Sequence, residues 1–192
     1  VGNDVTASYA GAVTLTGDAQ VSSTGNGAGV GLTLGGPVDS DATPRSLTQT
    51  GNGRVTFAGA VGATNPLASL TTGAGQVTRV EGGQIRTAGD QTYASRLALG
   101  AATTLSTTAG GDITVTGRVD GNANVLNLAT GAGNVTMTNA LNDFATVAVT
   151  SANTVALADA NDLTLNSSNF GTLTATAAST LTLGGALTAT GA

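Results

Sequence analysis

Four short runs between Gly131 and Asn166 alternate apolar residues with small, mostly polar ones, and this alternation constrains the fold more than any other feature of the chain. Side chains alternate between the two faces of a strand, so the apolar members of each run share one face. Gly, Asn, Asp and Ser separate the runs, which predicts short strands joined by turns. The apolar members are Val135/Met137, Val147/Val149, Val155/Leu157 and Leu163/Leu165.

Similar runs recur about every 8–12 residues along the chain, which predicts about twenty short strands of roughly three to five residues each. No window keeps the apolar period of an amphipathic helix. We therefore expect an all-β protein with helix close to absent. The strand candidates include Val13–Leu15, Gly31–Leu34, Arg54–Phe57, Gln76–Arg79, Arg96–Leu99, Asp112–Val115, Leu173-Thr174, Thr180–Leu183 and Leu187-Thr188.

A longer repeat of about 80 residues lies beneath these strands. The offset between the two copies of the repeat changes slightly along the chain, and small deletions in the turns between strands account for this change. The repeat divides into about four coils of 20 residues or three of 27, which indicates a solenoid of parallel strands. Three alignments define it: Tyr9–Val21 with Tyr93–Leu105, Gly31–Asp39 with Asp112–Asp120, and Gly51–Val61 with Gly131–Leu141, at shifts of 84, 81 and 80 positions.

Side-chain size favours a solenoid over a sandwich or barrel. Aromatic residues make up only 3% of the chain, whereas large residues from both sheets usually fill a sandwich core about 10 Å thick. Val, Leu and Ile can stack on their own kind in successive coils at the strand spacing of ~4.8 Å. We expect an all-β parallel β-helix of about seven to nine coils. We interpret residues 1–192 as a single segment of a longer repetitive protein, since the pattern runs to both ends.

The charge and cysteine content argue against several kinds of partner and site. The net charge is -5, Lys and His are absent, and the six Arg form no basic patch in the sequence, so nucleic acid is not an expected partner. No apolar run approaches the roughly 18 residues of a membrane span. Cysteine is absent, which removes disulfides, thiol catalysis and Cys-based zinc sites.

Two pairs of carboxylates are the candidates for chemistry. Asp159 and Asp162 could share a cation or an acid/base role, but a turn capped by side-chain-to-backbone bonds before Leu163 explains them more simply. Asp39 and Asp41 could bind calcium, yet the regularly repeated Asp of calcium-binding β-rolls is missing. We therefore expect no catalytic residue, no metal site and no cofactor.

Several stretches predict turns or loops. Asp39–Arg45 contains Pro44 and three charges and should bulge from its coil. Pro37 should lie at a strand start or corner, because proline cannot donate to a central ladder, and Asn65-Pro66 should form a turn. The Gly-rich runs at 25–31, 73–75 and 131–133 precede neither Lys nor a helix, so we expect loops there and not phosphate sites.

Two functions of other classes stay open as alternatives. A glycan-binding or glycan-processing β-helix would need an acidic cluster with a base for catalysis, or an aromatic platform; the acids here lie mostly at turns, and Arg is a poor base. We expect no enzyme. An ice-binding solenoid would align Thr pairs on one flat face, although Thr is also simply a good strand residue. The pairs do not recur once per coil; they are Thr14/Thr16, Thr48/Thr50, Thr114/Thr116, Thr136/Thr138, Thr172/Thr174, Thr180/Thr182 and Thr188/Thr190.

Four stretches carry a resemblance to a known family: Gly53–Gly75, Gly89–Leu105, Asp112–Gly133 and Leu141–Leu165. Their amino-acid sequence pattern resembles the repeat region of filamentous haemagglutinin-like adhesins. These are the large exoproteins that Gram-negative bacteria export by two-partner secretion. The resemblance covers most of the chain. It implies a right-handed parallel β-helix outside the cell, in an adhesion or biofilm stalk.

Fold and resemblance together predict a structural extracellular segment of a bacterial adhesin or of a surface or matrix filament. It would act in adhesion, biofilm formation or filament assembly. The ends of a solenoid expose unpaired strand edges, so we expect self-association, either head to tail or lateral. Outward Thr, Ser and Asn could also bond glycans or host and matrix surfaces.

Overall fold

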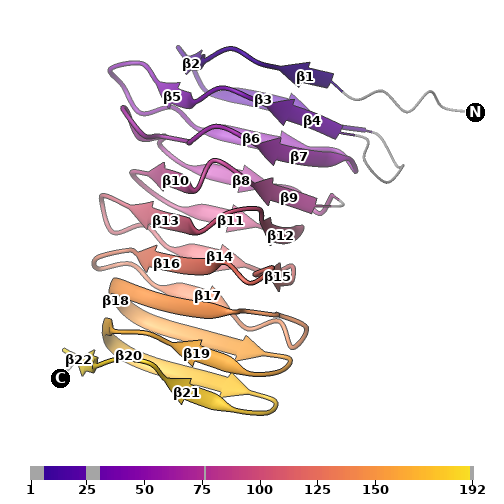
Figure 1. The fold of residues 1–192 in the computed structure, drawn as a ribbon. Helices are drawn as coiled ribbons and strands as arrows, with labels where there is room; N and C mark the ends of the chain where they lie inside the picture. The colour runs from indigo at the N-terminus through magenta and orange to yellow at the C-terminus, as the bar shows by residue number, and fades with distance from the viewer. Residues whose placement is uncertain (1–6, 25–30, 76, 191–192) are drawn as a thin grey trace, which may run out of the picture.

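The computed structural model describes residues 7–24, 31–75 and 77–190. Within these ranges the chain forms 22 strands and no helix. The strands wind into a β-solenoid of about eight turns, with the first described strand at one end of the stack and the last strands at the other (Figure 1). The all-β parallel β-helix of seven to nine coils predicted from the sequence is confirmed. The described part of the chain accordingly contains no helix that could cross a membrane.

Strands of successive coils pair in parallel and fall on three faces, named A, B and C here. Face A contains β1 (Ala7–Tyr9), β4 (Gly31–Leu34), β7 (Arg54–Phe57), β9 (Val77–Val80), β12 (Arg96–Leu99) and β15 (Val119–Asp120). Face B contains β2 (Val13–Leu15), β5 (Val38–Ser40), β10 (Gln84–Thr87), β13 (Thr103–Thr107), β16 (Val125–Ala129), the first part of β18 (Thr146–Asp159), β19 (Leu163–Leu165) and β21 (Leu181–Leu183). Face C contains β3 (Ala19–Ser22), β6 (Leu47–Thr50), β8 (Leu70–Thr72), β11 (Gln91–Tyr93), β14 (Ile113–Val115), β17 (Val135–Met137), the second part of β18, β20 (Ser168–Ala177) and β22 (Leu187–Ala189).

Between Gly131 and Asn166 the apolar members of each alternating run share one buried face of a strand, as predicted. Val135, Val147, Val155 and Leu163 are fully buried, and the four apolar partners two residues further on are at most 1% exposed. The intervening Thr136 points outward and is exposed. Most of the predicted strands also match to within one residue, because burying one face of a short strand leaves a period of two that can be read locally.

Two strands are longer than predicted. β18 has 14 residues and β20 has 10, whereas the sequence predicted strands of three to five residues, with a turn between Val149 and Val155. No turn forms between Val149 and Val155, because β18 runs without interruption from face B to face C. Its first part pairs with the strands of face B and its second part with those of face C. A register shift between Leu128 and Ala129 of the preceding coil absorbs the bend.

The last coils are shorter because face A ends. Its final link is an isolated bridge between Asp120 and Asp143. Beyond it, register partners such as Leu163 and Leu181 are 18 residues apart, whereas Gln91 and Ile113 higher in the stack are 22 apart. The third side of the solenoid is there reduced to a turn, in which Ala160 N donates to the Asn142 carbonyl oxygen at 2.8 Å.

The 80-residue repeat does not contain a whole number of coils. Its alignments match Tyr9 on face A with Tyr93 on face C, and Val13 on face B with Leu97 on face A. Each shift therefore advances about three and two-thirds coils. The prediction of whole coils of 20 or 27 residues was wrong, since all three faces require the same short alternation and the sequence cannot distinguish them.

Inward side chains stack in columns along the solenoid axis, as predicted from their size. The aliphatic columns form one continuous core, whose burial contributes about 1.5–3 kcal/mol per large side chain. Gln91 interrupts one such column, which runs through Leu47, Leu70, Gln91, Ile113, Val135 and Val155.

Glycine is required at the corner between faces A and B. A Cβ on Gly36, Gly59 or Gly82 would overlap the backbone of the glycine one coil before it. None of these three glycines has a positive φ. Glycine is therefore required at this corner because neighbouring coils approach closely, and not because the backbone conformation is unusual.

The predicted irregular stretches lie where the sequence placed them. Pro37 directly precedes β5, and Asn65-Pro66 lies in the bend before Leu67. The loop predicted at Asp39–Arg45 begins two residues later than expected, because Asp39 and the next residue pair with β2.

Candidate functional site

Asp159 and Asp162 do not converge on a common ligand. Asp159 is buried and accepts hydrogen bonds from Phe144 N and Asn161 N, both at 2.9 Å. Asp162 is exposed and accepts from Thr180 N of the next coil at 3.0 Å. Bonds from Ser179, and then from Thr180, lower the pKa of the Asp162 carboxyl. Asp159 therefore caps its own turn as predicted, whereas Asp162 bonds to the coil that follows.

Asp39 and Asp41 also bond to the protein itself. Asp39 Oδ1 accepts from Thr64 N at 2.9 Å, which ties the loop to the next coil. Asp41 forms a two-point ion pair with Arg45, at 3.1 Å and 3.0 Å. The Arg45 side chain holds the pKa of the Asp41 carboxyl below its ordinary value. Both carboxylates thus hold loops in place.

No group of three potential metal-ligating side chains gathers among residues 7–24, 31–75 and 77–190. The Gly-rich stretches at 73–75 and 131–133 are a bend and a turn between strands. Of the run at 25–31, residues 25–30 lie outside the described residues, and Gly31 begins β4. A shallow hollow at the N-terminal end of face C is lined by Asp18, Ala19, Gln20, Ser46 and Thr48.

Acidic and amide side chains form a ladder at the corner that precedes face C. Asp90 Oδ1 accepts from Asp112 N at 2.9 Å, and Asp112 Oδ1 accepts from Asn134 N at 2.7 Å. Asn134 Oδ1 then accepts from Asn153 Nδ2 at 3.0 Å. Each side chain bonds to the next coil, so this ladder fixes the coil register and has the chemistry of a structural element.

Sequence reasoning missed a polar cluster inside the core. Gln91 Nε2 donates to the Ser106 carbonyl oxygen at 2.8 Å and to Thr87 Oγ1 at 3.2 Å. The buried Tyr93 hydroxyl donates to Gln91 Oε1 at 2.9 Å, and burial raises the pKa of this phenol. Only the coil register, which places Gln91 between Leu70 and Ile113, reveals that the amide points inward.

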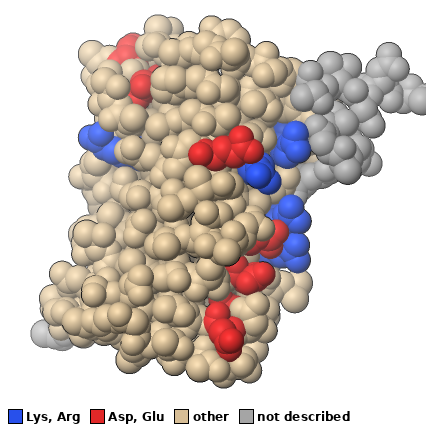
Figure 2. Space-filling view, in the orientation of Figure 1, with Lys and Arg blue, Asp and Glu red and all other residues tan. Residues whose placement is uncertain are grey.

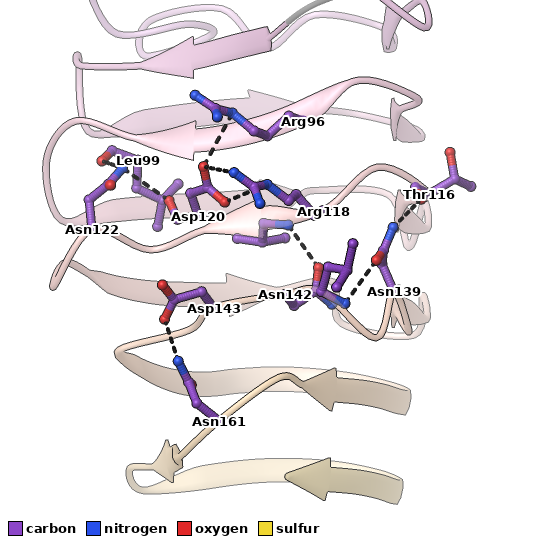
Figure 3. Close-up of polar contacts among 12 residues, drawn as sticks. Arg96, Leu99, Thr116, Arg118, Asp120, Asn122, Asn139, Asn142, Asp143 and Asn161 are labelled. Atoms are coloured by element: carbon purple, nitrogen blue, oxygen red, sulfur yellow. Dashed lines mark hydrogen bonds and ion pairs between the residues drawn. The ribbon is translucent and has the colours of Figure 1, made fainter. Parts of the chain in front are cut away.

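Asn142 joins neighbouring coils from a fully buried position (Figure 3). Its Oδ1 accepts from Val119 N at 2.7 Å, and its Nδ2 donates to the carbonyl oxygens of Met137 and Ala158, both at 2.9 Å. A buried amide with three satisfied partners is a structural group. The expectation that the Asn and Asp near residue 142 form corners agrees with this geometry.

A line of charged side chains follows face A. Figure 2 shows blue and red side chains in a stripe down this side of the molecule. Two carboxylates bind three arginines of this line. Glu81 Oε1 lies 2.6 Å from Arg79 Nε, and Asp120 lies 3.2 Å from Arg96 Nε and 3.0 Å from Arg118 Nε (Figure 3). We call this the face A stripe; it comprises Arg54, Arg79, Glu81, Arg96, Arg118, Asp120 and Asp143.

One outward column of face C consists mainly of threonine. Five successive coils place a Thr in the same register, and the next two coils contribute Ala156 and Thr174. The column contains no charged residue. It does not coincide with the predicted Thr-x-Thr pairs, because Thr14/Thr16 and Thr180/Thr182 lie on face B or beside it. We call it the threonine column; its members are Thr48, Thr71, Thr92, Thr114, Thr136 and Thr174.

The two ends of the described stack expose residues that belong to inward columns. Leu181 and Leu183 are 43% and 58% exposed, whereas their register partners Leu163 and Leu165 are at most 1% exposed. At the other end Tyr9, which pairs with the buried Leu34, is 52% exposed. The exposed ends are therefore cross-sections of the core.

Comparison with known proteins assigns no family. No protein-family model, curated protein or solved structure matches the chain. The β-solenoid itself is defined by the parallel strand pairing.

Proposed function

We propose that this chain is a structural, non-enzymatic segment of an extracellular bacterial adhesin or surface filament. It extends a stiff rod and presents its outer faces for adhesion, biofilm formation or filament assembly. The unbroken stack of parallel strands, with regular outward rows of small polar side chains, carries this proposal.

End-to-end stacking follows from the exposed leucines of β21. A coil placed on β21 would bury Leu181 and Leu183 in the way that β21 and its neighbours bury Leu163 and Leu165. Each buried leucine would contribute about 1.5–3 kcal/mol. β21 and β22 also lie at the end of their sheets, so their outer backbone groups are available for pairing. The added coil can come from the same polypeptide or from another copy.

The outer surface supports a role at the cell exterior of a Gram-negative bacterium. The sequence resembles filamentous haemagglutinin-like repeats, and the outward positions of faces B and C are mostly Thr, Ser, Ala and Asn. Hydroxyl and amide groups in regular rows suit hydrogen bonding to glycans or to matrix surfaces. Sustained pairing of parallel strands gives the stiffness that a stalk needs.

The end-stacking test compares two faces of one strand. Leu181→Lys/Leu183→Lys places charges on the inward positions of β21, and Thr182→Lys places one on its outward position as the control. Sedimentation velocity and electron microscopy of the chain should show rods that lengthen with concentration for the parent and the control, and short particles for the double variant. Compact particles for the parent, or equal lengthening by all three, would refute the proposal.

A second candidate is an ice-binding solenoid, which the threonine column favours. Hydroxyls and methyls at the strand spacing of ~4.8 Å form a regular uncharged row that could order water. Thr114→Tyr should abolish thermal hysteresis, whereas Thr104→Tyr on face B should retain it. A parent chain without thermal hysteresis would end this candidate.

A further inference from the structure

The face A stripe has an order of charge along the solenoid axis. Arg54 on β7 and Arg79 on β9 lie toward the N-terminal end together with Glu81, whereas Asp120 and Asp143 lie toward the C-terminal end together with Arg118. Arg96 lies between these two groups, in which the excess charge is positive and negative respectively. Figure 2 shows the same order, with only red side chains in the lowest part of the stripe. Four of the six arginines of a chain with net charge -5 lie on this face.

The stripe does not resemble a site for an anionic polymer. Such a site would present cations without competing carboxylates. Here Glu81 and Asp120 already bind three of the arginines on the same face. A partner of mixed charge fits better, with acids opposite the arginines and arginines opposite the acids.

We propose that the partner is a second copy of this chain, packed face A to face A with its axis antiparallel. Register places Arg79 directly beside Ala98, and Ala98 directly beside Asp120. Arg79 and Asp120 are thus one coil above and one coil below Ala98 in the same column. Two antiparallel copies centred on Ala98 bring Arg79 of each copy opposite Asp120 of the other, twice over by symmetry.

The outer parts of the stripe match in the same arrangement. Arg54 lies two coils above the centre and Asp143 two coils below it, in neighbouring columns, so they approach each other diagonally across the pair. Leu141 precedes Asp143 by two residues and is 64% exposed, although it lies away from both ends of the stack. The pair would cover this leucine with the aliphatic stem of the opposing Arg54.

The opposite, parallel arrangement lacks this match. Parallel copies would set each coil against the same coil of the partner, so Arg79 would lie level with Arg79 and Asp120 level with Asp120. Like charges at the same level repel. In the antiparallel pair only Arg96, in the coil of Ala98, lies level with its own copy, whereas in the parallel pair every charge does. The charge order along the stripe therefore selects the antiparallel pair.

The association should be weak and sensitive to salt. Exposed ion pairs contribute little each, and salt screens them. This inference rests on the proposed role as an assembling rod, and adds lateral pairing to growth at the ends. The two can fail separately, because end growth depends on Leu181 and Leu183 and lateral pairing depends on face A.

Charge reversal tests the pairing through a mixture. Arg79→Glu alone, and Asp120→Arg alone, should each weaken the lateral dimer by about tenfold or more, since each creates two repulsive pairs. Mixed in equal amounts they should recover dimers, because in the mixed pair both contacts are attractive again. The Leu181→Lys/Leu183→Lys background removes end growth, and sedimentation equilibrium at about 0.05 M and 0.5 M NaCl measures the dimer. Absence of a salt-sensitive dimer of the background chain, or a mixture as weak as its components, would overturn the proposal.

A cross-link gives a readout that does not depend on Asp120→Arg folding. Gly100 is exposed and lies at the level of Ala98, so Gly100→Cys on two antiparallel copies would bring the two thiols together. The new Cβ would lie 2.8 Å from Glu81 Cγ, so the flexible Glu81 side chain has to turn aside. The chain has no other cysteine. Mild oxidation should yield a disulfide-linked dimer for Gly100→Cys at low salt, and none for Thr136→Cys on face C. Equal cross-linking at both positions, or none at Gly100→Cys, would contradict the antiparallel pair.

Discussion

The buried pair of Gln91 and Tyr93 allows a quantitative test of the core. Tyr93→Phe removes only the hydroxyl that donates to Gln91 Oε1 at 2.9 Å. The amide oxygen is then buried without this donor, which should lower the free energy of unfolding by about 1–3 kcal/mol. Gln91→Leu should cost more than Tyr93→Phe, because the Tyr93 hydroxyl, which is 0% exposed, loses its acceptor and the Ser106 carbonyl oxygen and Thr87 Oγ1 lose the Nε2 donor.

The double variant Gln91→Leu/Tyr93→Phe should be more stable than the sum of the single losses implies. Leucine at this position continues the aliphatic column between Leu70 and Ile113, and phenylalanine keeps the shape of the tyrosine ring. Removing both polar partners at once leaves no unpaired hydroxyl or amide oxygen of this pair, so the coupling energy should be about 1–2 kcal/mol.

Urea titrations followed by circular dichroism measure these free energies. Each variant is compared at the same protein concentration in the Leu181→Lys/Leu183→Lys background, so that end growth does not contribute. If the two losses add to within about 0.5 kcal/mol, the hydrogen bond between the pair has no energetic role and the reasoning is refuted.

Three further predictions follow from corners and turns. Gly59→Ala should lower the melting temperature, because its Cβ overlaps the backbone of the preceding coil, whereas Gly17→Ala, with no atom within 4 Å, should leave it unchanged or slightly raised. Asn142→Ala should cost about 3 kcal/mol or more in urea titration, since it strips partners from two buried backbone groups and one part-buried group, while the exposed Asn161→Ala should cost less than about 0.5 kcal/mol. The carboxylate of Asp162 has a lowered pKa in the fold, so its stabilisation is complete above the ordinary value of 3.8 and is lost as the pH falls through the lowered value. Asp162→Asn should therefore reduce the acid dependence of amide exchange in the last coils; an unchanged dependence would contradict this assignment.

Strand positions were predictable because burial of one face is a local property of sequence. The inward positions from Val135 to Leu165 follow from alternation alone. The face that each strand occupies depends instead on how many residues each corner uses. That number varies from coil to coil, so the apparent 80-residue repeat matched Tyr9 with Tyr93 although they lie on different faces.

The surfaces proposed for function could not be predicted for the same reason. Arg54, Arg79 and Arg118 are far apart in sequence and carry no motif. Only the register of face A brings them into one stripe with Asp120. The threonine column likewise depends on register, since adjacent members are separated by spacings that differ from coil to coil. Side-chain bonds of Asp159 were predictable, because an Asp capping its own turn is a local motif.

Distances along the threonine column test the parallel stack most directly. Spin labels can be attached to cysteines that replace threonines in pairs. The pair Thr48→Cys/Thr136→Cys lies four coils apart, and the pair Thr48→Cys/Thr174→Cys lies six coils apart. At ~4.8 Å per coil, pulsed electron spin resonance should give separations of about 19 Å and 29 Å, before the label linkers are included. Equal separations for the two pairs, or a shorter one for the more distant pair, would contradict the solenoid.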